Sequence, residues 1–233
     1  MRLCRLAFCL AGCLGLAACK GTGGHDGLLV SHDPATLKHQ GMDRVDKVYP
    51  VMARLLATVP PGTCRKYHFV ASAVPNASMD MKGSLTISTG LLHLARTDDL
   101  LAFAIAHELS HAVLRHPARL RRAGWLQIIA SAAVAWAAHE AAGSTSDAAF
   151  AGGGFFLSTA LLGTLPLMRR MEKEADLMAR DLLHRAGFRT GGAEDFWKRY
   201  AAARPHRARP LWLSAHPTDA ARIRYLRSAP GVP

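Results

Sequence analysis

The chain has 233 residues, 50% of them hydrophobic, and a formal net charge of +12 at pH 7. Four of its five cysteines lie within the first 19 residues, which excludes a disulfide-rich fold and a zinc site built from cysteines. The arginines carry no recognition motif and no interleaved aromatic residues, so we expect no nucleic-acid partner despite the positive charge.

The N-terminus has the pattern of an export signal. A short basic region precedes an apolar run at 6–16, which is too short to cross a bilayer as a stop-transfer helix. The tetrapeptide Leu16-Ala17-Ala18-Cys19 resembles the bacterial lipobox and predicts a signal peptide at 1–18 and a lipid on Cys19. A plain signal peptide, or an uncleaved anchor with an incidental cysteine, is the alternative.

Loss of the signal would remove Arg2 and Arg5 and lower the formal charge from +12 to +10. This charge suits an anionic membrane surface or acidic envelope polymers, and a solvated basic surface without a partner is an equal alternative. Residues 19–27 are expected to be the lipidated cysteine and a flexible tether. Lys20 is not the aspartate that retains lipoproteins at the inner membrane, which favours the outer membrane.

The first predicted element of the mature chain is an amphipathic helix at 42–59, with apolar residues at three- and four-residue spacing up to Pro60. Residues 65–73 and 84–89 have the character of strands, and the turn-rich segment 75–83 lies between them.

A helix is predicted next, from Asp98 to the dipeptide His116-Pro117, and its centre reads H-E-x-x-H. Residues four apart share one face of a helix, so His107 and His111 can bind one ion while Glu108 points beside it. This is the zincin pattern of zinc peptidases. The alternative, two surface histidines and a solvated glutamate, is disfavoured because the neighbours are apolar.

A candidate for the third ligand lies at 171–176, where a second amphipathic helix is predicted to start and to run to Gly187. Glu172 and Asp176 are four apart, so one can bind the metal while the other accepts the N–H of a liganding histidine. An ordinary charged helix start is the alternative.

Two strongly apolar stretches, 125–138 and 148–168, lie between these motifs. The second has the length of a transmembrane helix, but three glycines and Pro166 interrupt it. We expect 125–168 to be an apolar helical insertion, packed near the cleft or lying on a membrane surface. A re-entrant hairpin in the membrane is the alternative.

Three ordered motifs, at 75–116, 169–176 and 215–226, resemble the HtpX and CaaX-prenyl-protease family of gluzincin metallopeptidases. The resemblance is greatest to its BepA-like periplasmic branch, without the helical-repeat domain of that branch. Ser78 and the dipeptide Met81-Lys82 depart from the family pattern, and both departures concern the substrate cleft.

The resemblance implies an α+β, predominantly helical metallopeptidase domain at 28–228, with a small sheet beside the HExxH helix and a tail at 229–233. It implies one Zn²⁺ ion per chain, bound by His107, His111 and Glu172. Glu108 would be the general base of catalysis. Asp176 is expected behind a liganding histidine.

Oxyanion stabilisation is expected from the C-terminal motif, with His216 as first candidate and Arg222 as second. The resemblance also implies that His216 can act as a regulatory zinc ligand, and a turn histidine beside Pro217 is an equal alternative. An extended peptide substrate is expected to pair with an edge strand. That predicted strand consists of Ser84, Leu85, Thr86, Ile87 and Ser88.

Together these features predict a zinc-dependent endopeptidase of the cell envelope of a Gram-negative-type bacterium. It would be lipid-anchored, face the periplasm and hydrolyse misfolded or misassembled envelope proteins, so its expected partners are protein substrates and the membrane. One alternative is a lipoprotein chaperone or assembly factor whose metal site is vestigial or gated by His216. Another is a zinc hydrolase that acts on a non-peptide envelope component.

Overall fold

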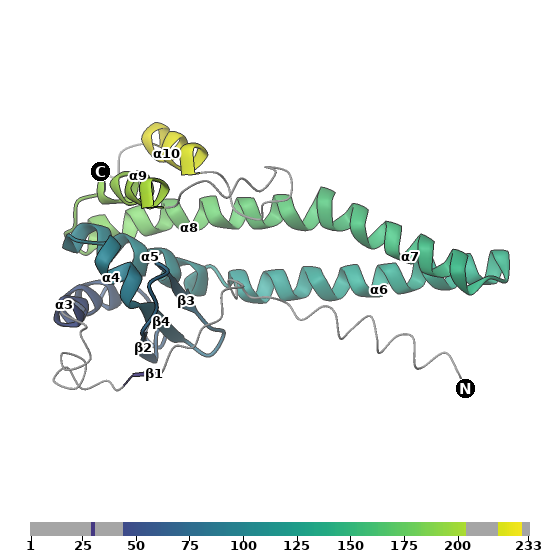
Figure 1. Cartoon of the computed structure of the whole chain (residues 1–233), viewed down its shortest axis with the longest axis horizontal. Helices are drawn as coiled ribbons and strands as arrows, with labels where there is room; N and C mark the ends of the chain where they lie inside the picture. The colour runs from purple at the N-terminus through teal and green to yellow at the C-terminus, as the bar shows by residue number, and fades with distance from the viewer. Residues whose placement is uncertain (1–28, 31–43, 204–218, 230–233) are drawn as a thin grey trace.

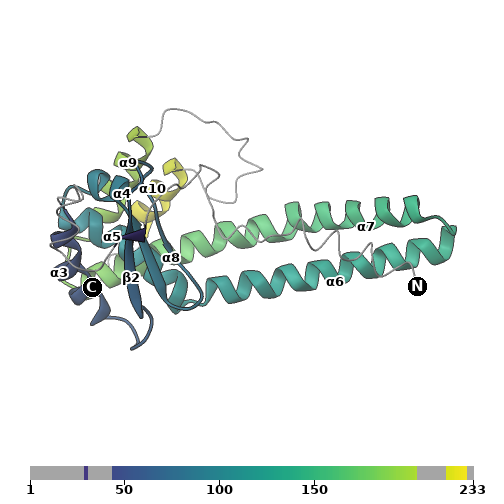
Figure 2. The ribbon, with the colours of Figure 1, turned by 60° about the horizontal axis from the view of Figure 1, so that its bottom comes forward.

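The computed structural model describes residues 29–30, 44–203 and 219–229 (Figure 1). The predicted signal peptide, Cys19, the tether and His216 lie outside the described residues. In the described part, a body of helices and one small sheet carries a long helical hairpin that projects from one side (Figures 1 and 2).

Helix α3 (Val45–Leu56) is the amphipathic helix predicted at 42–59, within the described residues. Its apolar positions face the core, and Val48 and Leu55 are fully buried. The helix ends at Ala57, before the Pro-Pro-Gly sequence that was expected to stop it.

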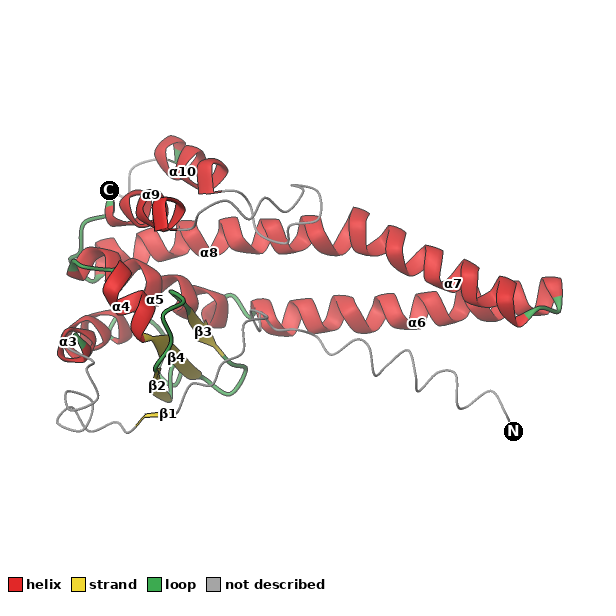
Figure 3. Ribbon diagram, in the orientation of Figure 1, coloured by secondary structure: helices red, strands yellow, loops and turns green. Residues whose placement is uncertain are grey.

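The sheet has four strands in the order β1-β2-β4-β3 (Figure 3). Strand β4 pairs in parallel with β2 and antiparallel with β3, and β1 pairs antiparallel with β2. The bounds of the strands are β1 (Leu29–Val30), β2 (Lys66–Val70), β3 (Ala77–Met79) and β4 (Ser84–Ser88).

The prediction that 84–88 is an edge strand is wrong, because β4 has a hydrogen-bonded neighbour on each side. In the segment 75–83, which was predicted to be turn-rich, three residues form β3 and pair antiparallel with β4. Strand β3 is therefore the edge of the sheet on this side.

After β4 the chain forms α4 (Thr89–Leu94) and then α5 (Asp98–Val113), the helix that carries H-E-x-x-H. Helix α5 begins as predicted, with the Thr97 side chain accepting a hydrogen bond from the Leu100 amide and two aspartates in its first turn. Ten of its 16 residues are buried, because α3, α8, α9 and β3 pack around it. It is the central element of the core.

The chain turns at Arg115, whose φ is 55°, and α6 (His116–Ala142) starts at the position where α5 was expected to end. Three elements then return beside α6, which are α7 (Thr145–Thr159), a π-helical turn η1 (Ala160–Thr164) and α8 (Leu165–Arg185). They form one continuous arm in Figure 1. The predicted helix start at residue 171 is therefore wrong, since Glu172 lies inside a longer helix.

Of the two placements expected for 125–168, packing near the cleft is wrong, and a position on or in a membrane stays a prediction. The hairpin points away from the body, and of residues 123–168 only Ser131 and Gly152 are buried (Figure 1). The long apolar pattern predicted the helices correctly, but it did not show that water would surround their large side chains in the isolated chain.

Helices α9 (Gly192–Ala203) and α10 (Asp219–Ser228) complete the body. Helix α9 packs on α5, and α10 packs on α9 and α8. The Arg180 side chain of α8 donates to the Leu226 carbonyl of α10 at 2.9 Å, which fastens the C-terminal helix in place. The predicted α+β, mainly helical fold with a small sheet beside the H-E-x-x-H helix is confirmed.

Candidate metal centre and active site

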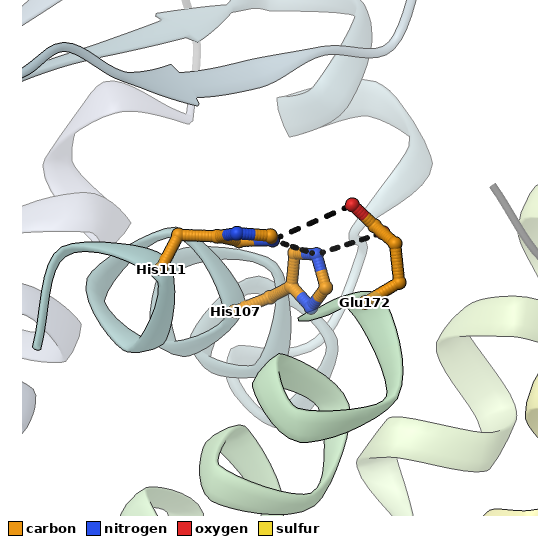
Figure 4. A group of neighbouring side chains, drawn as sticks. All are labelled: His107, His111 and Glu172. Atoms are coloured by element: carbon orange, nitrogen blue, oxygen red, sulfur yellow. Dashed lines mark hydrogen bonds and ion pairs between the residues drawn. The ribbon is translucent and has the colours of Figure 1, made fainter. Parts of the chain in front are cut away.

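Helices α5 and α8 pack side by side and bring His107, His111 and Glu172 together (Figure 4). The two Nε2 atoms of the histidines lie 3.1 Å apart. Glu172 places Oε2 3.6 Å from Nε2 of His107 and Oε1 3.6 Å from Nε2 of His111. Two histidines four positions apart and a glutamate about sixty positions later therefore point at one spot.

The packing of small side chains explains why the two helices approach so closely. Ala175 and Ala179 of α8 are fully buried. The distance between packed helices depends on the side chains at the contact, and alanines allow a close approach. Glu172, one turn before Ala175, is thereby carried to the histidine face of α5.

These donor atoms fit a zinc ion. Zinc binds imidazole nitrogen and carboxylate oxygen at about 2.0–2.2 Å, and ligand atoms at tetrahedral angles then lie about 3.3 Å apart. The observed separations of 3.1 and 3.6 Å lie on either side of that value. The three side chains keep 11–19% of their area exposed, so the spot is reachable from solvent.

Asp176 contacts His107. Of Glu172 and Asp176, one was predicted to bind the metal and the other to accept the N–H of a liganding histidine, and Asp176 has the second position. Its Oδ1 lies 2.9 Å from Nδ1 of His107, on the ring side away from His111. Burial alone raises the pKa of Asp176, but Arg222 and the contact with His107 outweigh it and lower that pKa to about 2. A charged Asp176 holds a proton on Nδ1, so Nε2 of His107 keeps its lone pair for a metal.

Glu108 lies beside the three converging residues and not among them, as the H-E-x-x-H spacing predicts. Its Oε2 accepts a hydrogen bond of 3.1 Å from the Met79 amide of strand β3. Burial raises the pKa of Glu108 to about 7. The carboxyl group is therefore held between α5 and the edge of the sheet, where it can exchange a proton with a molecule bound next to it.

The contacts of Arg222 differ from its predicted role as a donor to a substrate oxyanion. It is 3% exposed, and its Nε and Nη2 donate to the two carboxylate oxygens of Asp176 at 2.7 Å each. Its Nη1 lies 3.0 Å from Oε2 of Glu172, and its guanidinium stacks on Trp197 with 3.5 Å to the ring centre. Arg222 therefore positions the two carboxylates. Tyr225, one turn later on α10, also donates to Asp176.

The contacts of His116 and Glu174 with the site were not predicted from the sequence. Nδ1 of His116 lies 3.0 Å from Nδ1 of His111, and Nε2 of His116 lies 3.2 Å from Oε2 of Glu174. Arg119 and Arg170 also bind Glu174, at 2.8 Å each. The visible signal was a third histidine five residues after His111, which was interpreted only as the end of the helix.

Comparisons with known proteins agree with this site. Residues 43–229 match the family model of Peptidase family M48. The chain is 31% identical to Mitochondrial metalloendopeptidase OMA1 of Schizosaccharomyces pombe over 205 residues, which cover 85% of this chain and 54% of that protein. It is 28% identical to Metalloendopeptidase OMA1, mitochondrial, of Bos taurus over 164 residues, 68% of this chain and 31% of that protein.

The chain thus spans about half, or less, of the length of these curated relatives. The family match supports the predicted kind of metallopeptidase. The resemblance to a BepA-like branch stays a prediction.

Proposed function

The chain belongs to peptidase family M48, and from this premise we propose that it is a zinc-dependent metalloendopeptidase that cleaves proteins in the bacterial cell envelope. The observation that carries the proposal is the convergence of His107, His111 and Glu172, with Glu108 next to them. This arrangement supports the assignment of the first three as zinc ligands.

Each neighbouring side chain has a part in the proposed reaction. A metal at this spot would supply a Lewis acid that polarises the scissile carbonyl and lowers the pKa of water to about 7. Glu108 takes the proton of the attacking water and delivers it to the leaving amine. Asp176 fixes the tautomer of His107, and Arg222 holds the carboxylates of Asp176 and Glu172 in place.

We further propose that the substrate binds along β3 instead of β4. Met79 is in β3, and its amide points to Glu108, so the outer edge of this strand faces the site. An extended peptide that pairs with β3 would bring its backbone past Glu108 with little dependence on its side chains. Such tolerance suits misfolded or misassembled proteins as substrates.

The proposed location rests on the N-terminal sequence. The export signal and the lipobox-like Leu-Ala-Ala-Cys support a lipid on Cys19, with the catalytic domain in the periplasm and the outer membrane as the membrane concerned. His216 stays a proposed oxyanion donor or regulatory ligand from the C-terminal motif.

One substitution tests the function. Glu108→Gln keeps the three proposed ligands, so the purified protein should retain about one zinc per chain and lose cleavage of casein. His111→Ala should lose both. If Glu108→Gln retained cleavage, the proposed role of Glu108 as general base would be wrong. If the variant lost cleavage but still restored the phenotype of a deletion strain, the chain would act as an assembly factor and the peptidase proposal would be wrong.

A further inference from the structure

Each arm of the hairpin contains a long stretch without charged residues. Residues 123–138 of α6 and 148–168 of the returning arm contain no Asp, Glu, Lys or Arg. At 1.5 Å per residue these stretches are about 24 and 32 Å long, so the second matches the bilayer hydrocarbon thickness of about 30 Å and the first is shorter than it. Among the described residues, one helical stretch, Thr145–Arg185, is long and apolar enough to cross a membrane, and 6% of its most apolar window is buried.

The large apolar side chains of the hairpin point outward. Seven of them are between 58% and 85% exposed, and they are distributed over both arms: Trp125, Leu126, Ile129, Trp136, Phe150, Leu157 and Leu162. Large apolar patches are uncommon on soluble proteins and often mark sites of protein or membrane interaction. This surface requires a partner that covers both arms.

The two arms contact each other through small residues. A Cβ atom added at Gly152 would lie 2.8 Å from Cβ of Ala135 and 3.0 Å from the Ser131 carbonyl, so α7 and α6 are nearly in backbone contact there. Small residues between helices are typical of membrane proteins, where lipid provides no hydrophobic force to press helices together. A hairpin built for water would instead bury its large side chains between the arms.

Three polar side chains of the arms form hydrogen bonds within the hairpin. Gln127 donates to the Phe156 carbonyl at 2.8 Å, and Thr164 donates to the Gln127 side chain at 3.0 Å. Thr159 donates to the carbonyls of Phe155 and Phe156, next to the π-helical turn. These three side chains find their hydrogen bonds inside the hairpin, as a hydrocarbon environment requires, whereas the buried Ser131 hydroxyl has no partner among the described residues.

Polar residues bound the apolar stretches at both ends. The arginine collar at the base of the two arms consists of Arg119, Arg121, Arg122, Arg169 and Arg170. Arg119 from α6 and Arg170 from α8 both bind Glu174, so the two halves of the collar meet. His139, Glu140 and Asp147 flank the tip of the hairpin. The collar is complementary to anionic lipid headgroups.

We propose that the hairpin (residues 123–168) inserts into a lipid bilayer, with the arginine collar among anionic headgroups on the side of the catalytic body. The proposal concerns a second membrane attachment in addition to the predicted lipid on Cys19. It does not depend on the peptidase activity.

Tryptophan fluorescence provides the test, because Trp125 and Trp136 lie on the exposed surface. The purified full chain is mixed with vesicles of phosphatidylcholine and phosphatidylglycerol whose acyl chains are brominated. Insertion should quench the two tryptophans, and the quenching should be lost in the variant Trp125→Phe/Trp136→Phe. All variants share the same N-terminus, so differences between them report on the hairpin.

Charges introduced on the arms should prevent insertion. The double variant Ile129→Asp/Leu157→Asp should show no bromine quenching, whereas the matched tip variant Ala141→Asp should be quenched like the parent. Circular dichroism and cleavage of a short soluble peptide should be the same for both, since these positions are remote from Glu108.

The collar makes a separate contribution. Arg121→Gln/Arg122→Gln should weaken binding to the anionic vesicles by about 30-fold at low salt, since each basic residue near an anionic surface contributes about fivefold. Pure phosphatidylcholine vesicles should show no such difference. Equal quenching of the parent and the Ile129→Asp/Leu157→Asp variant would overturn the proposal. So would a stable dimer in buffer that the same double variant dissociates, because a second copy would then cover the apolar surface.

Discussion

Nδ1 of His116 lies 3.0 Å from Nδ1 of His111, and this contact connects the first residue of α6 to a proposed metal ligand. The other nitrogen of His116 lies 3.2 Å from Glu174, which is two residues after Glu172. The contact uses the ring nitrogen of His111 that faces away from His107. It therefore holds His111 with Nε2 toward the metal centre, as Asp176 does for His107.

Replacing His116 should weaken metal binding without removing a ligand. We expect His116→Ala to lower zinc affinity about 10- to 100-fold, the usual effect of losing a partner of a liganding histidine. His116→Asn, which can still donate or accept at this distance, should restore part of the loss. Competition with a chromophoric chelator measures the affinity. Equal affinity of His116→Ala and the parent would contradict the role.

Arg222 should be needed for stability as well as for the site. Its removal leaves two buried carboxylates without their cation, and breaking a buried ion pair in this way costs about 3–5 kcal/mol. Arg222→Lys should recover only part of this, because lysine cannot make the paired contact with Asp176. Arg224→Ala on the exposed side of α10 is the matched control, and urea unfolding is the measurement. A small effect of Arg222→Ala, like that of the control, would show that α10 does not hold the site together.

Two neighbouring glycines in α7 should respond in opposite ways. Gly152→Ala should separate the arms and destabilise the hairpin by about 1–3 kcal/mol, because the new Cβ has no room against Ala135. Gly153 has open space, so Gly153→Ala should favour the helix by up to about 1 kcal/mol. Protease nicking between residues 123 and 168 in the absence of lipid reports the difference. The same nicking rate for both variants would rule out the close contact between the arms.

The contribution of Glu194 to the stability of the docked helix α10 should depend on pH. Arg227 and Lys198 bind Glu194 and lower its pKa to about 2 from an ordinary value of 4.5. A lowered pKa in the folded state means that the contribution to stability is complete above pH 4.5 and is lost as the pH falls toward 2. Glu194→Gln should therefore have a slightly lower Tm than the parent at neutral pH. The difference should vanish near pH 2, and a difference that grew in acid would contradict this role of Glu194.

The spacing of residues along the chain predicted the features that lie within one helix. The interval between His107 and His111 fixes a common helix face, and the interval between Glu172 and Asp176 does the same on α8. The parts that failed depend on distant contacts. Strand β3 has three residues and exists because β4 pairs with it, and His116 meets Glu174 only because α6 and α8 lie together.

The predicted packing of 125–168 near the cleft was wrong for a different physical reason. An apolar run indicates that its side chains avoid water, but it does not indicate whether protein or lipid covers them. The close approach of α6 and α7 at Gly152 and the hydrogen bond of Gln127 to the other arm support the proposal that lipid covers them, and neither contact can be read from the sequence.

Because α8 is continuous, it also fixes the distance between the arginine collar and the catalytic centre. Glu172 follows Arg170 by two residues in an unbroken helix, a rise of about 3 Å along its axis. With the collar among the headgroups, the scissile bond of a substrate would have to lie within a few ångströms of the lipid surface. Cleavage would then select juxtamembrane segments by their height above the bilayer, and a freely diffusing protein would meet the centre only after coming down to that plane.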